Sequence, residues 1–371
     1  MDLKLKLSSS PHFRDKNSTR KIMLLVILAL IPALIGAIFI YGPDYGFRSG
    51  IISLIGVISA MVAEGIAEVM RKRGLTSILD GSAALTGLLL AFNLPPTVPF
   101  WVPVVGSFVG IWFGKMVFGG IGFNIFNPAL IGRAFLVAAY PTIMTASWAP
   151  PAANHITMAG FSPDVLKSKI HTEVQPEKID AITGATPLTA FKEAKRVLTN
   201  PQSNPQQIDY AEATVNSLYS QESLLNLFLG RVGGCIGETS ALLLIIGGLF
   251  LCFLGIVNWR MPLFYIGTVF ILSWILGGAK GFFTGSPLFA IFSGGLMLGA
   301  FFMASDMVTS PITNVGQIIF AIGAGILVVV IRAYGGYAEG VSFSILLMNA
   351  FTPLIDRYTR PKVFGTKEVK T

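Results

Sequence analysis

A series of ten apolar stretches constrains this 371-residue chain more than any other feature, because each approaches the ~20 residues that a helix needs to cross a bilayer. Five precede a long polar segment and five follow it. They are Ile22–Tyr41, Gly50–Met70, Ser77–Leu94, Val102–Phe118, Phe126–Tyr140, Ala241–Val257, Met261–Leu276, Leu288–Ser305, Val315–Ile331 and Val341–Ile355. Since lipid offers no partner to free backbone groups, such segments fold as helices. We therefore expect an all-α polytopic membrane protein with ten transmembrane helices.

The composition agrees with a chain whose solvent is mostly lipid. Hydrophobic residues make up 53% and charged residues only 12%, against roughly 25% charged in an ordinary soluble domain. This balance excludes a soluble enzyme. It also means that the net charge of +8 reflects membrane topology and not nucleic-acid binding.

The basic residues predict an orientation in the cell membrane. If the tail of residues 1–21 is cytoplasmic, alternation places Arg71, Lys72, Arg73, Arg260 and the basic C-terminal tail of residues 357–371 on the same side. Cytoplasmic short loops carry an excess of Lys and Arg, so both termini are expected inside. The first apolar stretch is expected to stay as a membrane helix, not a signal peptide. The chain then divides into a five-helix unit of residues 22–140, an extracytoplasmic loop of residues 141–238 and a second five-helix unit of residues 239–356.

Five helices on each side of the loop give the two units opposite orientations, which predicts an inverted repeat. Two helices look broken at corresponding places, the third between Asp80-Gly81 and Asn93, and the eighth before Asp306 and Ser310-Pro311. Broken helices in both halves of a membrane protein often mark a midplane binding site. The alternative is that these segments only fill the interior of the bundle.

One segment of the polar loop has the pattern of a helix start. Thr186 fits an N-cap, Pro187 fits the first helical position, and good helix formers follow as far as Leu198. As a cap alone, the motif is structural. A helix N-terminus behind Gly184-Ala185 is also suited to a phosphate, and the Thr186 hydroxyl offers a point of covalent attachment.

The stretch Asp180-Ala181-Ile182-Thr183-Gly184-Ala185-Thr186 resembles a flavinylation motif, in which a flavin transferase esterifies FMN to the last threonine. Together with Gly119–Ala129, Gly237-Glu238-Thr239-Ser240 and Ala304-Ser305-Asp306, it makes nearly the whole chain resemble the D subunits of Rnf electron-transport complexes. These are similar to the B subunits of sodium-pumping NADH:quinone reductases, which have longer N-terminal tails. The family often has Pro after the last Asp, where Met307 stands here.

The resemblance implies a urea-channel-like fold, covalent FMN on Thr186 and a second, non-covalent flavin, riboflavin, within the bundle. Asp180, Thr183, Gly184 and Ala185 would complete the attachment motif. The implied partners are a flavin transferase, membrane lipid and the flavoprotein and iron–sulfur subunits of the complex. The implied activity is electron transfer from ferredoxin to NAD⁺ coupled to Na⁺ or H⁺ movement, in which this subunit is inactive alone. The alternatives are the corresponding quinone-reductase subunit and an inverted-repeat solute channel or transporter.

Ionisable residues inside predicted helices are functional candidates. Arg133 is expected either to pair with an acidic group or to hold a flavin phosphate or ring oxygen, and with Asn127 it completes the predicted cofactor-binding set. Glu238 and Asp306 are candidates for a cation path, with helix capping or ion pairing as the alternative. Glu64 and Glu68 lie one turn apart near Arg71 and Arg73, which favours ion pairs among these four.

Cysteine and histidine predict no metal site. Cys235 and Cys252 lack a second cysteine or histidine at ligand spacing, so Cys235 is expected to be a small buried residue before a helix. His155 and His171 fall in the polar loop, where solvated positions are expected.

Overall fold

The computed structural model describes residues 18–145, 148, 186–279 and 281–360. Helices, and no strand, make up the regular structure of these residues. The helices in chain order are α1 Thr19–Met70, η1 Leu75–Asp80, α2 Ser82–Phe92, α3 Trp101–Ile111, η2 Trp112–Met116, α4 Pro128–Ala139, α5 Pro141–Thr145, α7 Pro187–Thr199, α8 Pro205–Leu218, α9 Gln221–Leu229, η3 Ile236–Glu238, α10 Ala241–Phe253, α11 Arg260–Leu276, α12 Pro287–Phe292, α13 Leu296–Leu298, η4 Gly299–Met303, α14 Asn314–Tyr334 and α15 Val341–Thr359. Each of the ten apolar stretches contains a helix.

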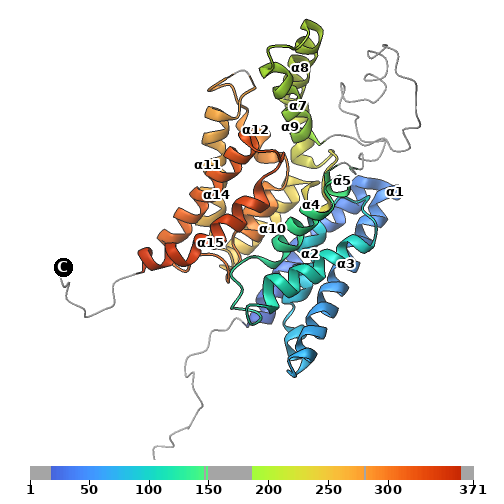
Figure 1. Ribbon diagram of the computed structural model, residues 1–371, viewed down its shortest axis with the longest axis vertical. Coiled ribbons are helices and arrows are strands. Elements are labelled where there is room, and N and C mark those ends of the chain that lie inside the picture. The colour runs from blue at the N-terminus through green and yellow to red at the C-terminus, as the bar shows by residue number, and fades with distance from the viewer. Residues whose placement is uncertain (1–17, 146–147, 149–185, 280, 361–371) are drawn as a thin grey trace, which may run out of the picture.

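The first two stretches form the two arms of α1, which folds back at Gly42. This glycine has φ +66°, a left-handed conformation that its missing Cβ allows. The arms run side by side in Figure 1, and Gly46 packs against the backbone of Ile38. The reversal needs non-helical φ and ψ at one residue, Gly42. The segment between Tyr41 and Gly50, expected to be a loop, is therefore helical except at Gly42.

The two helices predicted to be broken are broken. Gly81, with φ +83°, separates η1 from α2, where Asp80 Oδ1 accepts a hydrogen bond from the Ser82 amide at 2.7 Å. In the second half, Ser293, Gly294 and Gly295 separate α12 from the short helix made by α13 and η4. The break therefore lies inside the eighth stretch as well as after it.

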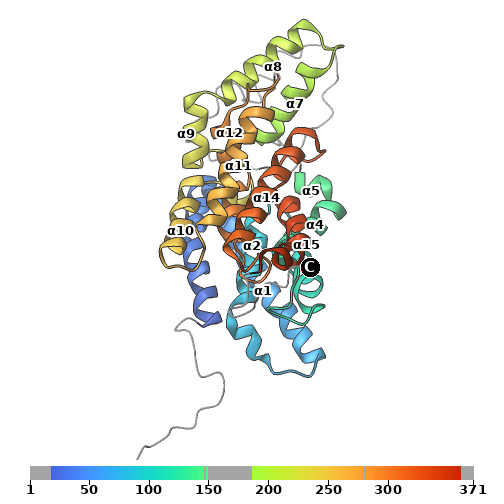
Figure 2. The ribbon, with the colours of Figure 1, turned by 90° about the vertical axis from the view of Figure 1, so that its left-hand side faces the viewer.

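The two halves of the chain share one apolar core. Helix α1 packs against α10, and α4 packs against α15, as Figures 1 and 2 show. The segment before α10 ties the halves further: the Ile236 amide donates to Leu94 O at 3.0 Å, and Tyr41 Oη donates to Gly234 O at 2.6 Å. Glycine allows close helix contacts, since a Cβ on Gly56 would lie 2.7 Å from Gly87 O.

Three helices replace much of the predicted loop. Helices α7, α8 and α9 form a small cluster at one end of the molecule, at the top of Figure 1. Each begins at a capping residue, namely Thr186, Asn204 or Ser220. Capped, amphipathic helices of this kind satisfy their own backbone groups, so this region is a folded cap on the bundle.

By length and composition, α1 and α14 are the described helices able to cross a membrane. Five others are apolar but shorter, between 10 and 17 residues. Their apolar side chains also point outward, and α10, for example, exposes Ile246, Leu249, Phe250 and Phe253. An apolar exterior of this extent fits a lipid-embedded bundle.

Candidate functional site

Thr186 occupies the N-cap position of α7, as its sequence predicts. Its Oγ1 accepts a hydrogen bond from the Thr189 amide at 3.2 Å and lies 2.8 Å from Thr189 Oγ1. Pro187 follows at the first helical position. Thr186 is largely buried, with 8% of its surface exposed. The hydroxyl is therefore held at the positive end of the helix dipole by its own helix.

A cavity of about 720 Å³ opens beside Thr186, between α7 on one side and α4, α5 and the α14–α15 connection on the other. One face of α7, made by Thr189, Lys192, Arg196 and Thr199, lines it at helical spacing. The cavity falls within the range typical of sites for cofactors and other small molecules.

The cavity is basic and aromatic. Five cations against two acids, Glu193 and Glu339, make its wall net positive. The cations are Arg133, Lys192, Lys195, Arg196 and Arg332, and the aromatic residues are Trp148, Phe191, Tyr334, Tyr337 and Phe343. The rings of Tyr337 and Phe343 stack with centroids 5.1 Å apart. Lys192 Nζ donates to Gly335 O at 2.5 Å, and burial lowers its pKa. A planar, anionic ligand suits such a wall, since cations pair with its charge and rings pack against its plane.

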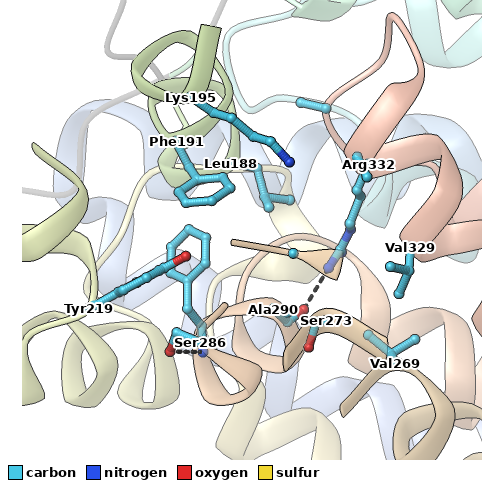
Figure 3. Close-up of a pocket in the computed structure, with 14 residues that line it drawn as sticks. Leu188, Phe191, Lys195, Tyr219, Val269, Ser273, Ser286, Ala290, Val329 and Arg332 are labelled. Carbon is cyan, nitrogen blue, oxygen red and sulfur yellow. Dashed lines mark hydrogen bonds between the residues drawn. The ribbon is translucent and has the colours of Figure 1, made fainter. Parts of the chain in front are cut away.

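A smaller pocket shows how α7 docks on the bundle (Figure 3). Leu188 and Phe191 on α7, Tyr219 after α8 and Phe289 on α12 line it, with Arg332 on the opposite side. The rings of Phe191, Tyr219 and Phe289 pack with centroids 5.5–5.8 Å apart. Arg332 donates to the carbonyls of Ala290, Ser293 and Glu339. These contacts fix α7 against the second half of the chain, so the position of Thr186 is set by tertiary packing.

Arg133 lies at the inner wall of the large cavity and pairs with Glu339 of the α14–α15 connection. Arg133 Nη1 also donates to Asn93 Oδ1 at 2.7 Å and to Ser342 Oγ at 2.9 Å. Two roles are expected for Arg133, and the structure contains the first of them, the ion pair with an acidic group. The guanidinium still borders the cavity, where it contributes positive charge.

Glu238 lies beside this ion pair, at the end of η3. The ligand atoms of Cys235, Glu238 and Glu339 all lie within 4.8 Å of one another. Burial and the nearby Glu339 carboxylate raise the pKa of Glu238. Burial is the largest influence on Glu339 and opposes its ionisation, but Arg133, a hydrogen bond with Glu238 and Arg332 together lower the pKa of that carboxyl. Among the described residues, only this trio gathers three groups that could act as metal ligands.

A sequence model of the NQR2, RnfD, RnfE family matches residues 6–365. The chain belongs to this family. It is 44% identical to the D subunit of the proton-translocating ferredoxin:NAD(+) oxidoreductase complex of Clostridium ljungdahlii, over 97% of this chain and 96% of the relative. It is 41% identical to the D subunit of the Na(+)-translocating ferredoxin:NAD(+) oxidoreductase complex of Acetobacterium woodii, over 100% and 98%. The D subunit of the ion-translocating oxidoreductase complex of Stutzerimonas stutzeri is 40% identical, over 94% and 93%.

The remaining predicted residues of this NQR2, RnfD, RnfE family member lie apart from the cavity or outside the described residues. Asn127 is the N-cap of α4, where its Oδ1 accepts from the Ala129 amide at 3.0 Å. Asp306 accepts from the Thr309 hydroxyl at 3.0 Å and from the Val308 amide, so it stabilises a turn between η4 and α14 and caps neither helix. The predictions that fall outside the described residues concern Asp180, Thr183, Gly184, Ala185, His155 and His171.

The prediction of ion pairs among Glu64, Glu68, Arg71 and Arg73 is wrong for Glu64. Both of its carboxylate oxygens lie 2.7 Å from Lys115 Nζ, and both side chains are almost fully buried. Arg71 instead donates to Met116 O. Within the described residues, no ion pair joins either glutamate to Arg71 or Arg73. The reason is that π-helix η2 turns Lys115 toward α1, where only an anion can offset a buried ammonium.

Sequence reasoning missed Lys115, Glu339, Lys192 and Arg196 in this family member. Lys115 falls inside an apolar stretch, and a lone charge there is a functional candidate that could have been found. For Glu339, the sequence predicted only that Arg133 could pair with an acidic group and did not indicate which residue that would be. Lys192 and Arg196 share a face of α7 with Thr189 at helical spacing, which the helix prediction could have exposed.

Proposed function

We propose that this chain is the membrane subunit of an ion-translocating ferredoxin:NAD⁺ oxidoreductase complex, and that it carries FMN on Thr186 and relays electrons through it. The names of the relatives from Clostridium ljungdahlii and Acetobacterium woodii support the type of complex. The partners are then the flavoprotein and iron–sulfur subunits, since these provide the redox centres that a chain with two cysteines lacks.

The observation that carries the proposal is the position of Thr186 in the wall of the basic, aromatic cavity. Its hydroxyl stands at a helix N-terminus, where backbone N–H groups favour a phosphate. Lys192 and Arg196 extend the positive charge along the same face of α7. A volume of about 720 Å³ leaves room for an isoalloxazine ring among the aromatic side chains. The residues present therefore fit FMN.

In this assignment Thr186 Oγ1 would form the phosphoester and the N-terminus of α7 would favour the phosphate, while Lys192 and Arg196 would add positive charge farther along the cavity wall. Asp180, Thr183, Gly184 and Ala185 serve the flavin transferase as its recognition motif. When bound, FMN accepts and passes on electrons, which is chemistry that the protein side chains cannot supply. The chain contributes anchoring, orientation and a medium of low polarity. Arg133, at the inner wall, adds a positive charge that favours an anionic cofactor.

The membrane arrangement is part of the same proposal. Ten spans in two inverted five-helix units, urea-channel-like, are supported by the ten helical stretches and by the breaks in the third and eighth. A second flavin, riboflavin, would lie within the bundle, toward which Asn127 faces through its contact with Met303 O at 3.3 Å. Cation passage would use the second half of the chain, near Glu238 and Asp306.

Mass spectrometry of peptides from the chain co-expressed with a flavin transferase tests the FMN assignment. The adduct is expected on Thr186 and is expected to be absent from Thr186→Val. Thr189→Val is the matched control, because Thr189 shares the hydrogen bond and the cavity wall but should leave the adduct in place. An adduct that survives Thr186→Val, or that moves to Thr189, would overturn the assignment.

Cysteine labelling tests the topology. In a Cys252→Ser background, with Cys235 buried, Gln206→Cys on α8 and Arg73→Cys after α1 place exposed thiols at the two ends of the molecule. An impermeant reagent added to intact cells is expected to label position 206 and not position 73. The reverse pattern would refute an extracytoplasmic α7–α9 cluster and cytoplasmic termini.

A further inference from the structure

Glu238 and Glu339 form an acid pair between the large cavity and the interior of the bundle. The two carboxyls come from η3 and from the α14–α15 connection, and they lie within 4.8 Å of each other and of Cys235 Sγ. Glu339 lines the large cavity, while Thr186, Glu238 and Glu339 together line a smaller pocket behind it. The pair thus connects the attachment residue with the core of the protein.

Among the residues that the structure describes, only one carboxyl of the pair, that of Glu339, has a counter-charge in contact with it. Arg133 binds Glu339 and is held in place by Asn93 and Ser342. Arg332, the other cation nearby, directs its nitrogens at three backbone carbonyls. Two ionised carboxylates at this separation repel each other strongly, and one of them then holds a proton.

One carboxyl oxygen of Glu238 has no hydrogen-bond partner in the described part of the chain. This atom, Oε1, is shielded from solvent and lies close to Gly295, where a Cβ would stand 3.0 Å away. The Tyr41 hydroxyl is engaged with Gly234, and the Cys235 thiol donates to Asn93 O at 3.4 Å. A neutral acid costs far less to bury here than a carboxylate.

We infer that Glu238 carries a proton at neutral pH and that the Glu238–Glu339 pair delivers it to an electron-accepting cofactor in the cavity beside Thr186. As one electron reaches the cofactor from a redox partner subunit, the O–H bond of Glu238 breaks and one proton passes by way of Glu339 to the cofactor. Glu238 is left transiently as a carboxylate, and a hydronium ion from solvent gives up a proton to restore its O–H bond, leaving water. The delivery step rests on the proposed cofactor, whereas the protonation of Glu238 does not.

A proton suits this site better than a metal ion. Arg133 already supplies Glu339 with its positive charge, and the Cys235 thiol keeps its hydrogen for Asn93 O. A neutral Glu238 has no charge to offer Na⁺. If Glu238 belongs to an ion path, the ion that passes it is therefore H⁺.

Infrared spectroscopy of the purified full-length chain tests the protonation without any flavin. Thr186→Val, which lacks the attachment site, is expected to show a carboxylic-acid C=O band at neutral pH that Glu238→Gln in the same background removes. Glutamine imitates the neutral acid in shape and charge, so the variant is expected to fold. Glu222→Gln on the exposed face of α9 is the control and should keep the band. A spectrum unchanged by Glu238→Gln, or a band that Na⁺ or Zn²⁺ removes at constant pH, would overturn the inference.

Reduction of the flavinylated chain with dithionite tests the delivery step. In time-resolved spectra after rapid mixing, the Glu238 band of the wild type is expected to fall as the cofactor is reduced and then to recover, and the protonation of the reduced cofactor is expected to slow in Glu238→Gln. A Glu238 band that does not respond to reduction would refute delivery while leaving the protonated acid. Failure to find FMN on Thr186 by mass spectrometry is a separate result, and it would refute the proposed function together with the delivery step while leaving the protonation of Glu238.

Discussion

Arg133 on α4 and Glu339 in the α14–α15 connection form a largely buried ion pair across 206 residues of sequence. The pair joins the first half of the chain to the second at the wall of the cavity. Because each partner would be a buried, uncompensated charge without the other, the contact constrains how α4 and α15 pack. It also gives Glu339, and not Glu238, a positive partner near Thr186.

Breaking this pair from one side is expected to destabilise the chain. Arg133→Met leaves Glu339 beside Glu238 without a counter-charge and should cost about 3–5 kcal/mol, whereas Arg133→Met combined with Glu339→Leu should recover most of that loss. Thermal unfolding in detergent measures the stability of Arg133→Met and of the double variant. A double variant no more stable than Arg133→Met would show that the pair contributes more than mutual neutralisation.

The buried pair of Lys115 and Glu64 gives a second prediction. Lys115→Met leaves Glu64 unpaired and is expected to lower stability by about 3–5 kcal/mol, because a buried carboxylate loses its counter-charge. Adding Glu64→Gln to Lys115→Met should restore most of the lost stability. The matched control is Lys72→Met, on an exposed residue just after α1, which should change stability little. Equal effects of Lys115→Met and Lys72→Met would contradict the ion pair.

The capping and attachment roles of Thr186 can be separated. Thr186→Val removes the oxygen that accepts from the Thr189 amide, so α7 should lose about 1 kcal/mol. Thr186→Ser keeps a hydroxyl at the cap and is expected to retain stability. Unfolding of the flavin-free chains gives the comparison. A Thr186→Val chain as stable as Thr186→Ser would argue against a capping role.

Alkaline pH is expected to weaken the docking of the α7–α9 cluster through Tyr219. Burial raises the pKa of Tyr219 to about 12, so the folded chain holds a neutral phenol that the unfolded chain ionises near pH 10. The stabilisation is complete below pH 10 and is lost as the pH rises toward 12. Tyr219→Phe should remove this part of the pH dependence. Identical pH profiles of the thermal midpoint in wild type and Tyr219→Phe would refute a contribution of Tyr219 to the loss of stability at alkaline pH.

Features that depend on near neighbours in the chain were predictable from the residues alone. Apolar stretches of near-membrane length indicate the ten helical segments. Gly42 and Gly81 occupy turns that need a left-handed backbone, and Thr186 with Pro187 marks the start of α7. Each of these is decided within a few residues by backbone sterics, capping and hydrophobicity. The same reasoning could have found α8 and α9 from Asn204-Pro205 and Ser220.

Long-range packing, in contrast, decided which charges meet and where the cavity lies. Glu64 has arginines seven and nine residues away, yet its partner is Lys115, 51 residues along the chain. A buried Arg133 needs an anionic partner, and the packing of α4 against α15 places Glu339 next to it. The large cost of burying a lone charge selects whichever opposite charge the fold brings close, so these partners depend on the whole fold. The walls around Thr186 come from α4, α5, α7 and the α14–α15 connection, and no local pattern encodes their meeting.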